Sequence, residues 1–561
     1  MINQAAVFHR TSSEYKIPLA KDELSLRLIC ARENLEKVKI IWWKRNFQEH
    51  KNTQEMELYA RTKIRDDYRL TLKTQERTHY IQYCFQIINK EETLYFSQRG
   101  FTKEFPEEPW FEHLWTNDNE ILKEPKWAMD VVYYQIFPDR FARSQDSLEN
   151  KDLVSWGSKP TRDNYMGGNL KGIQEHLDYF VNLGIDVIYL CPIFKGAFNH
   201  RYATINYFEI DPMLGTEKDL VELVQKLHKK GIKIILDGVF NHVATEFKKF
   251  KEFIEEGKNK QWFFPLEKES KISKVKYECV GDYGPMPKLN TSNLQVVDYI
   301  YSIMDYWLNR GIDGWRLDVA DEVDITAWII IKTHLRKDHP DCLLLGETWN
   351  DGVNNLCTGT QLNCCMNYQF RNAVLDFFAL RNINSFLFIS QIEEVLSCYP
   401  DIINHCNYNL LSSHDVSRFM SICKKDKSLY SLAICFQFLF IGSPAIFYGD
   451  EFGMEGEDDP DCRKCMNFIG DNNLYKLTKD LIFLRKKYPC LKRGKIKFLE
   501  EYCTSSLLVF ERFDDKDKLL IYINLGEKLV NVKKANCIFE YPQSNKLDLE
   551  KLESKSIKIY S

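Results

Sequence analysis

Short apolar runs alternate with helical patterns over about 350 residues from Trp127 onward. Seven of these runs have the length and composition of buried strands: residues 131–137, 185–194, 232–240, 312–319, 342–346, 408–413 and 445–448. Helical patterns lie between many of them, and a glycine follows those at 216–229 and 296–309, as is typical of a helix end. A strand–helix unit repeated in this way folds as a closed parallel barrel or as a doubly wound sheet.

The segments before and after this region have β-like patterns. Apolar residues alternate with polar ones at 24–30, and branched and aromatic runs follow at 38–42 and 80–85. We therefore expect an N-terminal β-sandwich over residues 1–122. The strand–helix region, residues 127–495, includes a long insertion after its third strand, at 243–290. Short β-like segments predict a small C-terminal β-domain over residues 496–561.

Charge and hydropathy exclude several classes of function. The chain carries 76 basic and 80 acidic residues, interleaved, for a net charge of −4, which gives no reason to expect a nucleic acid as partner. The best membrane-span candidate, 432–447, is interrupted by Gly–Ser–Pro at 442–444, and the N-terminus lacks the pattern of a secretory signal. We expect a cytoplasmic protein with no membrane partner. Cys462 and Cys465 form a lone CxxC, which is a weak zinc signal without a second pair.

Four acidic residues stand where a predicted strand ends: Asp237, Asp318, Glu347 and Asp415. The carboxyl ends of all strands in a parallel barrel open on one face, so these side chains would converge there. A single carboxylate in such a place can instead cap the next helix. Because four recur, most with Arg, His or Asn close by, we interpret the set as a functional site.

Paired carboxylates are what glycoside hydrolysis needs, because two carboxyl groups must flank the scissile bond and one of them must be protonated. Arg316 lies two residues before Asp318, so both side chains point to the same face of the strand. The guanidinium is predicted to keep Asp318 ionised. Crowding by the other carboxylates is predicted to keep Glu347 protonated.

Four segments resemble the successive signature regions of the α-amylase superfamily, glycoside hydrolase family 13. They are residues 237–242 (DGVFNH), 314–319 (GWRLDV), 346–349 (GETW) and 413–415 (SHD), and they occur in the order of that family. The resemblance extends over nearly the whole chain from 133–141 (YYQIFPDRF) onward. It implies a (β/α)8 barrel, and a hydrolase that cleaves α-linked glucans with retention through a covalent glucosyl–enzyme intermediate.

The resemblance also implies a role for each matching residue. Asp318 is the expected nucleophile, Glu347 the general acid/base, and Asp415 the third carboxylate, which stabilises the transition state. The other expected site residues all contact the substrate: His200, Tyr202, His242, Arg316, Trp349, His414, Asp459 and Arg463. Taken singly, the histidines and Tyr202 would more often be core residues, and Asp459 with Arg463 a helix-spaced salt bridge. The complete set of motifs favours the functional interpretation.

One branch of the family is more similar than the others. Residues 286–290 (MPKLN) resemble the short motif of the neopullulanase, cyclomaltodextrinase and maltogenic amylase branch. Glu322 and Trp349 are similar to that branch as well. The N-terminal domain resembles carbohydrate-binding module family 34, which in this branch builds a homodimer. The resemblance therefore implies a homodimer that acts on cyclodextrins, short maltooligosaccharides and pullulan.

Several positions depart from the pattern of this branch. Its calcium loop is rich in Asn and Asp, but here the loop reads Arg–Ser–Gln–Asp–Ser–Leu–Glu at 143–149, so most of the expected oxygen ligands are missing. We therefore expect no required cofactor and no bound metal, although calcium is the ion that the branch would offer. Asn350 stands where His is common, and Ala203 and Asn206 stand where Asp is usual. Asn350 leaves the balance of hydrolysis and transglycosylation open.

Two other functions compete with this one. A general α-amylase, an oligo-1,6-glucosidase or a glucan transferase would share the same barrel, and the preference between α-1,4 and α-1,6 bonds stays open. A catalytically inactive sugar-binding protein is the remote alternative, because such relatives usually lose one of the three carboxylates and this chain has all three. No glycine-rich phosphate loop follows a strand, which disfavours a nucleotide enzyme.

Overall fold

The computed structural model describes the chain except for residues 145–152, 350–355, 358, 533–535 and 544–550. It divides into two compact units. The smaller unit contains Met1–Lys123 together with Asp351–Leu362 and Leu387–Asp401, and the larger one contains the rest of the chain.

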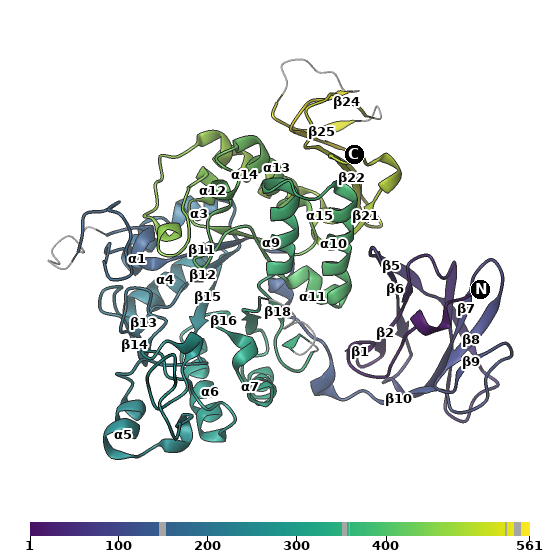
Figure 1. Cartoon of the computed structure of the whole chain (residues 1–561), viewed down its shortest axis with the longest axis horizontal. Coiled ribbons are helices and arrows are strands. Elements are labelled where there is room, and N and C mark those ends of the chain that lie inside the picture. The colour runs from purple at the N-terminus through teal and green to yellow at the C-terminus, as the bar shows by residue number, and fades with distance from the viewer. Residues whose placement is uncertain (145–152, 350–355, 358, 533–535, 544–550) are drawn as a thin grey trace. The chain divides into compact units, whose positions relative to one another are not determined.

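Eight parallel strands form the central sheet of the larger unit, and helices surround them (Figure 1). In chain order they are β11 (Tyr133–Ile136), β12 (Val187–Leu190), β15 (Lys233–Gly238), β16 (Gly314–Leu317), β17 (Leu343–Gly346), β18 (Cys364–Cys365), β19 (Tyr408–Leu410) and β20 (Ser443–Phe447). Neighbours in the sheet follow the order β18-β17-β16-β15-β12-β11-β20-β19. A parallel bridge between Met366 and Tyr408 then links the two end strands, so the sheet is a nearly closed barrel. The expected (β/α)8 fold is confirmed.

The sixth barrel strand, β18, is the one element of the barrel that the sequence pattern did not predict. It has only two paired residues, Cys364 and Cys365, and both are buried. A strand this short carries no alternation and no apolar run of its own. It is a strand only because Cys364 and Cys365 pair with Leu345 and Gly346 of β17, a contact that no local sequence pattern indicates.

The helix that follows β14 shows why the expected helices form where they do. Thr216 caps α4 (Glu217–Lys229) in a reciprocal capping box with Asp219, which satisfies two backbone donors at the helix start. Its apolar residues Leu220, Leu223 and Leu227 recur at helical spacing and are fully buried, and α4 contacts β15. The helices of the larger unit also include α2 (Leu170–Glu175), α3 (Leu177–Leu183), α6 (Leu294–Leu308), α7 (Ile325–Asp338), α9 (Tyr368–Val374), α13 (Lys427–Leu439) and α14 (Asn472–Lys487).

The long segment between β15 and α6 folds back on the barrel. It contains α5 (Lys248–Glu256), and isolated bridges join His242 to Lys288 and Phe263 to Leu289. A second excursion follows β12, where the hairpin β13 (Phe194–Gly196) and β14 (Thr204–Ile210) encloses the segment that carries His200 and Tyr202.

The smaller unit contains two antiparallel sheets that share one core. One sheet has the order β1 (Lys16–Ala20), β2 (Glu23–Ala31), β6 (Arg65–Lys73), β5 (Glu57–Arg61). The other has the order β4 (Asn52–Glu55), β3 (Lys37–Lys44), β7 (His79–Ile88), β8 (Thr93–Ser97), β9 (Gly100–Thr102), with β10 (Phe111–Trp115) paired to β7. Leu24, Leu26 and Leu28 alternate with partly exposed residues and pack in one apolar cluster with Ile40 and Phe85 of the second sheet. The expected N-terminal β-sandwich is confirmed.

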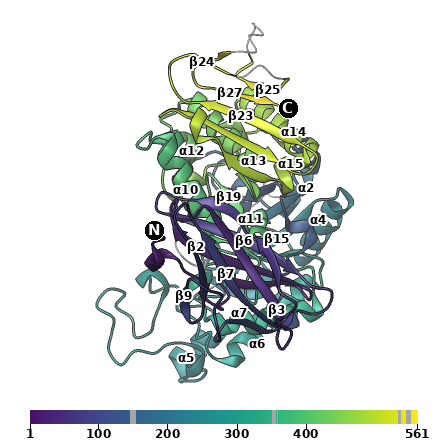
Figure 2. The same ribbon diagram turned by 90° about the vertical axis from the view of Figure 1, so that its right-hand side faces the viewer.

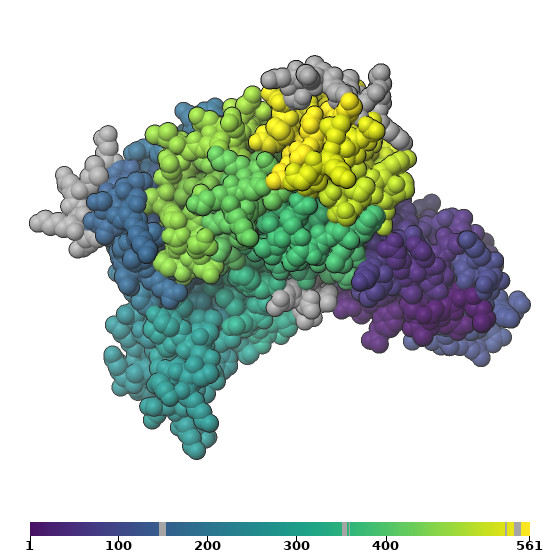
Figure 3. Space-filling view, turned by 45° about the horizontal axis from the view of Figure 1, so that its top comes forward, coloured from purple at the N-terminus to yellow at the C-terminus, as the bar shows by residue number. Residues whose placement is uncertain are grey.

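A five-stranded antiparallel sheet follows α14 and α15 (Pro489–Arg493) near the C-terminus, in the order β21 (Lys495–Phe498), β22 (Leu507–Phe513), β23 (Lys518–Asn524), β27 (Ser556–Tyr560), β25 (Cys537–Tyr541). The small pair β24 (Val530–Asn531) and β26 (Lys551–Leu552) lies beside it. Figure 2 shows this sheet over α13 and α15, and Figure 3 shows the yellow C-terminal residues packed on green ones. The buried Arg512 guanidinium joins the parts by donating to the carbonyls of Leu439 and Cys490.

No helix in the described part of the chain is both long and apolar enough to cross a membrane. Cys462 and Cys465 are free thiols, and both are buried.

Candidate active site

The four acidic residues at the strand ends converge because the barrel strands are in register. Asp237 of β15 lies opposite Arg316 of β16. Leu317 of β16 lies opposite Gly346 of β17, so the next residue of each strand, Asp318 and Glu347, leaves the sheet at the same level. Asp415 comes from the loop after β19. The carboxyl ends of the strands therefore deliver the carboxylates to one place, as predicted.

The Arg316 guanidinium is the centre of this cluster, and it is fully buried. Its Nη1 atom donates to Asp237 Oδ1 at 2.9 Å and to Asp318 Oδ1 at 2.8 Å. Its Nη2 atom forms an ion pair with Glu347 Oε2 at 2.8 Å and lies 3.9 Å from Asp415 Oδ2. Because Nη1 and Nη2 belong to one guanidinium, the oxygens that they contact are close neighbours. Asp318 and Glu347 thus flank one small volume, as a pair acting on one bond must.

One positive charge does not neutralise four carboxylates, and the pKa values of three of them are raised. Burial first, opposed by Arg316 and helped by Glu347, raises the pKa of Asp318 well above its usual value. Burial also raises the pKa of Asp237. Burial and then the Glu347 charge raise the pKa of Asp415 to about 7. Arg316 lowers the pKa of Asp318, as predicted, but burial outweighs this effect and the net direction is upward.

A stability prediction follows from the raised pKa of Asp415. The native state binds its proton more tightly than the unfolded state, so its ionisation removes stability as pH rises from about 4 to about 7. We expect Asp415→Asn to raise the melting temperature, by on the order of 2 °C at pH 8 and by much less near pH 4. Differential scanning calorimetry of both proteins across this pH range measures the difference.

Asp67 provides the control with the opposite sign. Burial acts to raise its pKa, but ion pairs with Arg69 and Arg27 outweigh burial and the pKa is lowered. Asp67→Asn should therefore lower the melting temperature at pH 8. An Asp415→Asn protein that melts below the wild type at pH 8, to the same extent as at pH 4, contradicts the assignment.

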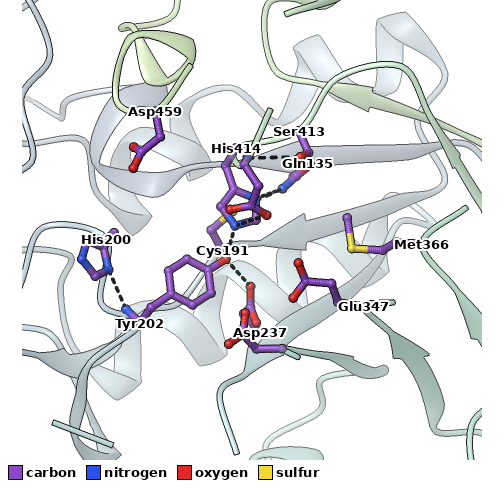
Figure 4. A network of polar contacts seen from close by, with 12 residues as sticks. Gln135, Cys191, His200, Tyr202, Asp237, Glu347, Met366, Ser413, His414 and Asp459 are labelled. Carbon is purple, nitrogen blue, oxygen red and sulfur yellow. Dashed lines mark hydrogen bonds and ion pairs between the residues drawn. The ribbon is translucent and has the colours of Figure 1, made fainter. Parts of the chain in front are cut away.

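A network of aromatic and imidazole side chains adjoins the carboxylates (Figure 4). The Tyr202 hydroxyl donates to Asp237 Oδ2 at 2.9 Å and contacts His414 Nε2, and the Tyr202 and His414 rings are parallel with centroids 5.3 Å apart. The Tyr189 hydroxyl donates to the same Asp237 oxygen at 2.5 Å. His414 Nε2 also lies 3.1 Å from Asp415 Oδ2. Tyr202 and His414 thus form one wall beside the third carboxylate.

The three histidines expected in the site are neutral at pH 7. Burial lowers the pKa of His200 to about 3 and that of His242 to about 4, and it lowers the pKa of His414 well below its usual value. His200 Nδ1 accepts the Tyr202 backbone N–H at 3.1 Å, which places the two side chains together. The negative charge of Glu347 raises the pKa of His242, but burial lowers it by more. Neutral imidazoles suit the recognition of uncharged sugar hydroxyl groups, because each offers one donor and one acceptor.

Asp459 and Arg463 lie at the edge of the site and connect to it. Arg463 Nη1 pairs with Asp459 Oδ1 at 2.9 Å, its Nη2 lies 3.7 Å from Asp415 Oδ1, and its Nε donates to the His414 carbonyl at 2.7 Å. Arg162 approaches Asp459 from outside at 3.7 Å. Asp459 and Arg463 therefore form the helix-spaced salt bridge, and Arg463 also contacts two residues of the site.

Trp349 completes the set of expected residues. Its indole Nε1–H donates to Glu347 Oε1 at 3.0 Å, and its ring stacks on Tyr368 with centroids 4.1 Å apart. The side chain is 43% exposed, which leaves a flat apolar surface beside the Glu347 carboxylate. The structure thus brings together all eleven residues that the sequence predicted for the site.

Four buried residues of the site were missed: Gln135, Tyr189, Cys191 and Tyr368. Tyr189 and Gln135 belong to barrel strands, and strand periodicity could have assigned them to the same inner face as their partners. Cys191 directly follows β12 and accepts from Gln135. No sequence signal identified Tyr368. Its ring stacks on Trp349, and no motif of the sequence links these two positions.

No group of three or more His, Cys, Asp or Glu side chains suited to a metal ion occurs among the described residues. Most of the atypical calcium loop, from Gln145 onward, lies outside them, and so does Asn350. Asn206 donates to Glu209 at 3.3 Å. Nothing in the structure explains Ala203, which is fully buried.

Comparison with known families decides the relationship of the chain. Residues 135–473 match the family described as alpha amylase, catalytic domain. The chain belongs to the α-amylase family. Residues 1–115 match the alpha amylase N-terminal ig-like domain. The chain is thus a glycoside hydrolase of this family, and it contains the carboxylates on which the resemblance was based.

Its relatives confirm the expected branch. The chain is 35% identical over 550 residues to a cyclomaltodextrinase of Geobacillus thermopakistaniensis (strain MAS1). The matched region covers 95% of this chain and 92% of that protein. It is 34% identical over 539 residues to neopullulanase 2 of Thermoactinomyces vulgaris, covering 93% and 91%. A solved cyclomaltodextrinase structure superposes with a TM-score of 0.90 at 30% identity, covering 100% of this chain and 98% of that one.

Proposed function

We propose that this member of the α-amylase family hydrolyses α-glucosidic bonds of cyclodextrins, maltooligosaccharides and pullulan, with retention of anomeric configuration. α-1,4 bonds are the expected main target. The observation that carries the proposal is the placement of Asp318 and Glu347 on two nitrogens of one buried arginine, at the carboxyl ends of adjacent barrel strands. The names of the relatives supply the substrate class.

In the proposed first step, Asp318 attacks the anomeric carbon while Glu347 donates its proton to the glycosidic oxygen. The bond between carbon and leaving oxygen breaks, and a covalent glucosyl–Asp318 ester forms. Arg316 holds Asp318 Oδ1, which leaves Oδ2 as the attacking atom. Asp318 attacks as the carboxylate, and this form is stabilised by Arg316 and by the positive charge that develops on the sugar ring.

In the second step, Glu347 acts as a base. Its carboxylate accepts a proton from water, the water oxygen attacks the anomeric carbon, and Asp318 leaves as a carboxylate. Trp349 donates to Glu347 Oε1 and the Val319 backbone N–H donates to Glu347 Oε2 at 2.9 Å, so both oxygens are held in place through the two steps. This fixed orientation is what a group that acts first as acid and then as base requires.

We propose that the remaining expected residues bind the sugar whose bond is cleaved and its neighbours. Asp415 and His414 lie side by side and offer an acceptor and a donor to adjacent sugar hydroxyl groups. The Tyr202 ring provides a flat apolar surface, with His200 and His242 nearby. Asp459 and Arg463 are placed to contact sugar on the non-reducing side, and Trp349 on the leaving-group side.

The test of the proposed specificity is product analysis. Purified protein is incubated with β-cyclodextrin, pullulan and soluble starch, and products are resolved over time. Rapid opening of cyclodextrin, with maltose or panose as end products, supports the proposal. Starch cleaved far faster than cyclodextrin would favour a general α-amylase, and turnover of no glucan would favour a non-catalytic sugar-binding protein.

We propose that the chain forms a homodimer through its N-terminal domain and that its domains are residues 1–122, 127–495 and 496–561. The match of residues 1–115 to the N-terminal domain of the family supports this organisation. Analytical ultracentrifugation should give twice the chain mass of 66.4 kDa. A species of 66.4 kDa at micromolar concentration contradicts the dimer.

We further propose a cytoplasmic location. Its support is a relative named intracellular maltogenic amylase from Bacillus subtilis, 32% identical over 86% of this chain. Fractionation of the source cells, with recovery of the activity outside the cell, would reject it.

Removal of divalent metal should have no effect on stability. The sequence of the loop at 143–149 supplies few of the carboxylates that a calcium site needs. We expect the melting temperature to be the same in EDTA and in millimolar calcium chloride, to within about 1 °C. An increase of several degrees with calcium, saturating with concentration, would show a bound ion.

A further inference from the structure

Gln135 is a buried polar side chain at the floor of the site that the proposed reaction does not use. It lies on β11 and is fully buried. Its amide nitrogen Nε2 lies 2.7 Å from His414 Nδ1 and 3.4 Å from Cys191 Sγ, and its carbonyl Oε1 accepts the Tyr408 hydroxyl at 3.3 Å. Figure 4 shows the Gln135 side chain directed at the His414 ring. Every polar atom of this amide thus has a partner inside the barrel.

The neighbours of His414 decide which ring nitrogen carries its proton. The Tyr202 hydroxyl proton goes to Asp237 Oδ2, so the Tyr202 oxygen accepts from His414 Nε2. Asp415 Oδ2 lies 3.1 Å from the same nitrogen without a hydrogen bond to it, and its carboxylate also favours a proton there. Both neighbours favour a proton on Nε2, which leaves Nδ1 as an acceptor. The group that faces Nδ1 must therefore be a donor, and this agrees with the amide nitrogen of Gln135 at that position.

The surroundings of the His414 ring keep it neutral, so it carries a single proton. Burial first, and then the positive charges of Arg316 and Arg463, disfavour an imidazolium ion at His414, while the Asp415 carboxyl group lies beside Nε2. A neutral histidine has one proton to offer. His414 can donate a hydrogen bond from Nε2 only if that nitrogen, and not Nδ1, carries the proton.

We propose that Gln135 is a positioning residue that fixes His414 as the neutral Nε2–H tautomer, with its single proton directed at the Tyr202 hydroxyl beside Asp415. The inference rests on the proposed function in that it takes His414 and Asp415 as the groups that bind the sugar. Gln135 itself touches no substrate. Tyr408 and Cys191 orient the amide, and the amide orients the imidazole.

The decisive variant is Gln135→Glu, which replaces the donor with an acceptor of the same shape. A carboxylate at this position draws the proton to Nδ1 and removes the donor from Nε2 when the ring is neutral. At lower pH the imidazolium forms and restores that donor. Loss of one pre-organised donor costs about 100-fold or more in kcat. We expect such a loss on β-cyclodextrin with KM changed by less than about threefold, because the contacts of the other binding residues remain. The kcat/KM profile should also gain an ionisation between about pH 5 and pH 8.

Two further variants separate positioning from folding. Gln135→Met removes both amide groups at similar volume, and Asp415 still attracts the proton to Nε2, so kcat should fall only about tenfold with no new ionisation. Gln437→Met is the matched control, since Gln437 is a buried glutamine of α13 whose amide donates to the Asn409 and Ala445 carbonyls at 2.8 and 2.9 Å. It should lower the melting temperature and leave kcat and the pH profile as in the wild type.

Nitrogen NMR of protein labelled with 15N-histidine tests the tautomer without any activity. The chain has 12 histidines, and the signal absent from His414→Gln identifies the one of interest. We expect Nδ1 unprotonated and Nε2 protonated in the wild type at pH 7. A proton on Nδ1, or Gln135→Glu with the kcat and pH profile of the wild type, overturns the inference. A wild type inactive on every glucan would instead reject the proposed function and leave the tautomer result valid.

Discussion

Asp318→Asn is expected to lower kcat on β-cyclodextrin by at least about 10⁴-fold, the largest effect of any single change in this site. The amide is a poor nucleophile and forms no ester with the anomeric carbon, so the first step loses its covalent route. The substitution keeps the shape of the side chain and the contact of its oxygen with Arg316. Binding of substrate should persist, since the sugar contacts proposed for His414, Tyr202 and Arg463 are unchanged.

The control for this variant is Asp313→Asn at the opposite end of the same strand. Asp313 precedes β16 and pairs with His228 and Lys233 at 2.7 and 2.8 Å, away from the carboxyl ends of the strands. It should lose stability and keep its activity at 25 °C. An Asp318→Asn protein that retains more than about 1% of wild-type turnover, free of contaminating wild type, would remove Asp318 from the role of nucleophile.

Glu347→Gln is expected to lower kcat on β-cyclodextrin by about 10³-fold, within the range that general acids and bases contribute. The amide has no proton to give to the leaving oxygen and takes none from water. The defect should depend on the leaving group, because departure of fluoride needs no proton. With α-maltosyl fluoride the first step should therefore be nearly normal, and the glycosyl–enzyme should accumulate because the second step lacks its base.

Rapid-quench kinetics with α-maltosyl fluoride measures this difference. A burst of fluoride equal to the amount of enzyme, followed by slow turnover, is the expected result for Glu347→Gln. Asp318→Asn should show no burst on the same substrate. Equal losses on β-cyclodextrin and α-maltosyl fluoride for Glu347→Gln would mean that Glu347 does not act on the leaving group.

Much of the site could be predicted because the chemistry lies at points that the sequence marks. An apolar run that stops at an acidic residue shows both the strand and its end, and in a parallel barrel all such ends share one face. Asp318 and Glu347 are therefore brought together by register alone. The N-terminal sandwich was predictable for a similar reason, because alternation such as that of residues 24–28 survives in the folded sheet.

What could not be predicted depends on the folded interior. The strand β18 has two residues and exists only through its pairing with β17. Gln135 contacts His414 across 279 positions of sequence, and no local pattern predicts that contact. The raised pKa of Asp318 could not be predicted either, because the sequence shows the nearby arginine but not how many carboxylates share it or how deeply all of them are buried.

The stereochemistry of the first product tests the central claim most directly. Proton NMR of β-cyclodextrin hydrolysis, recorded within minutes of adding enzyme, distinguishes the anomers of the new reducing end before they equilibrate. A double displacement through Asp318 predicts that the α anomer appears first and that the β anomer follows by mutarotation. A β anomer as the first product would show single displacement by water and would contradict the covalent route.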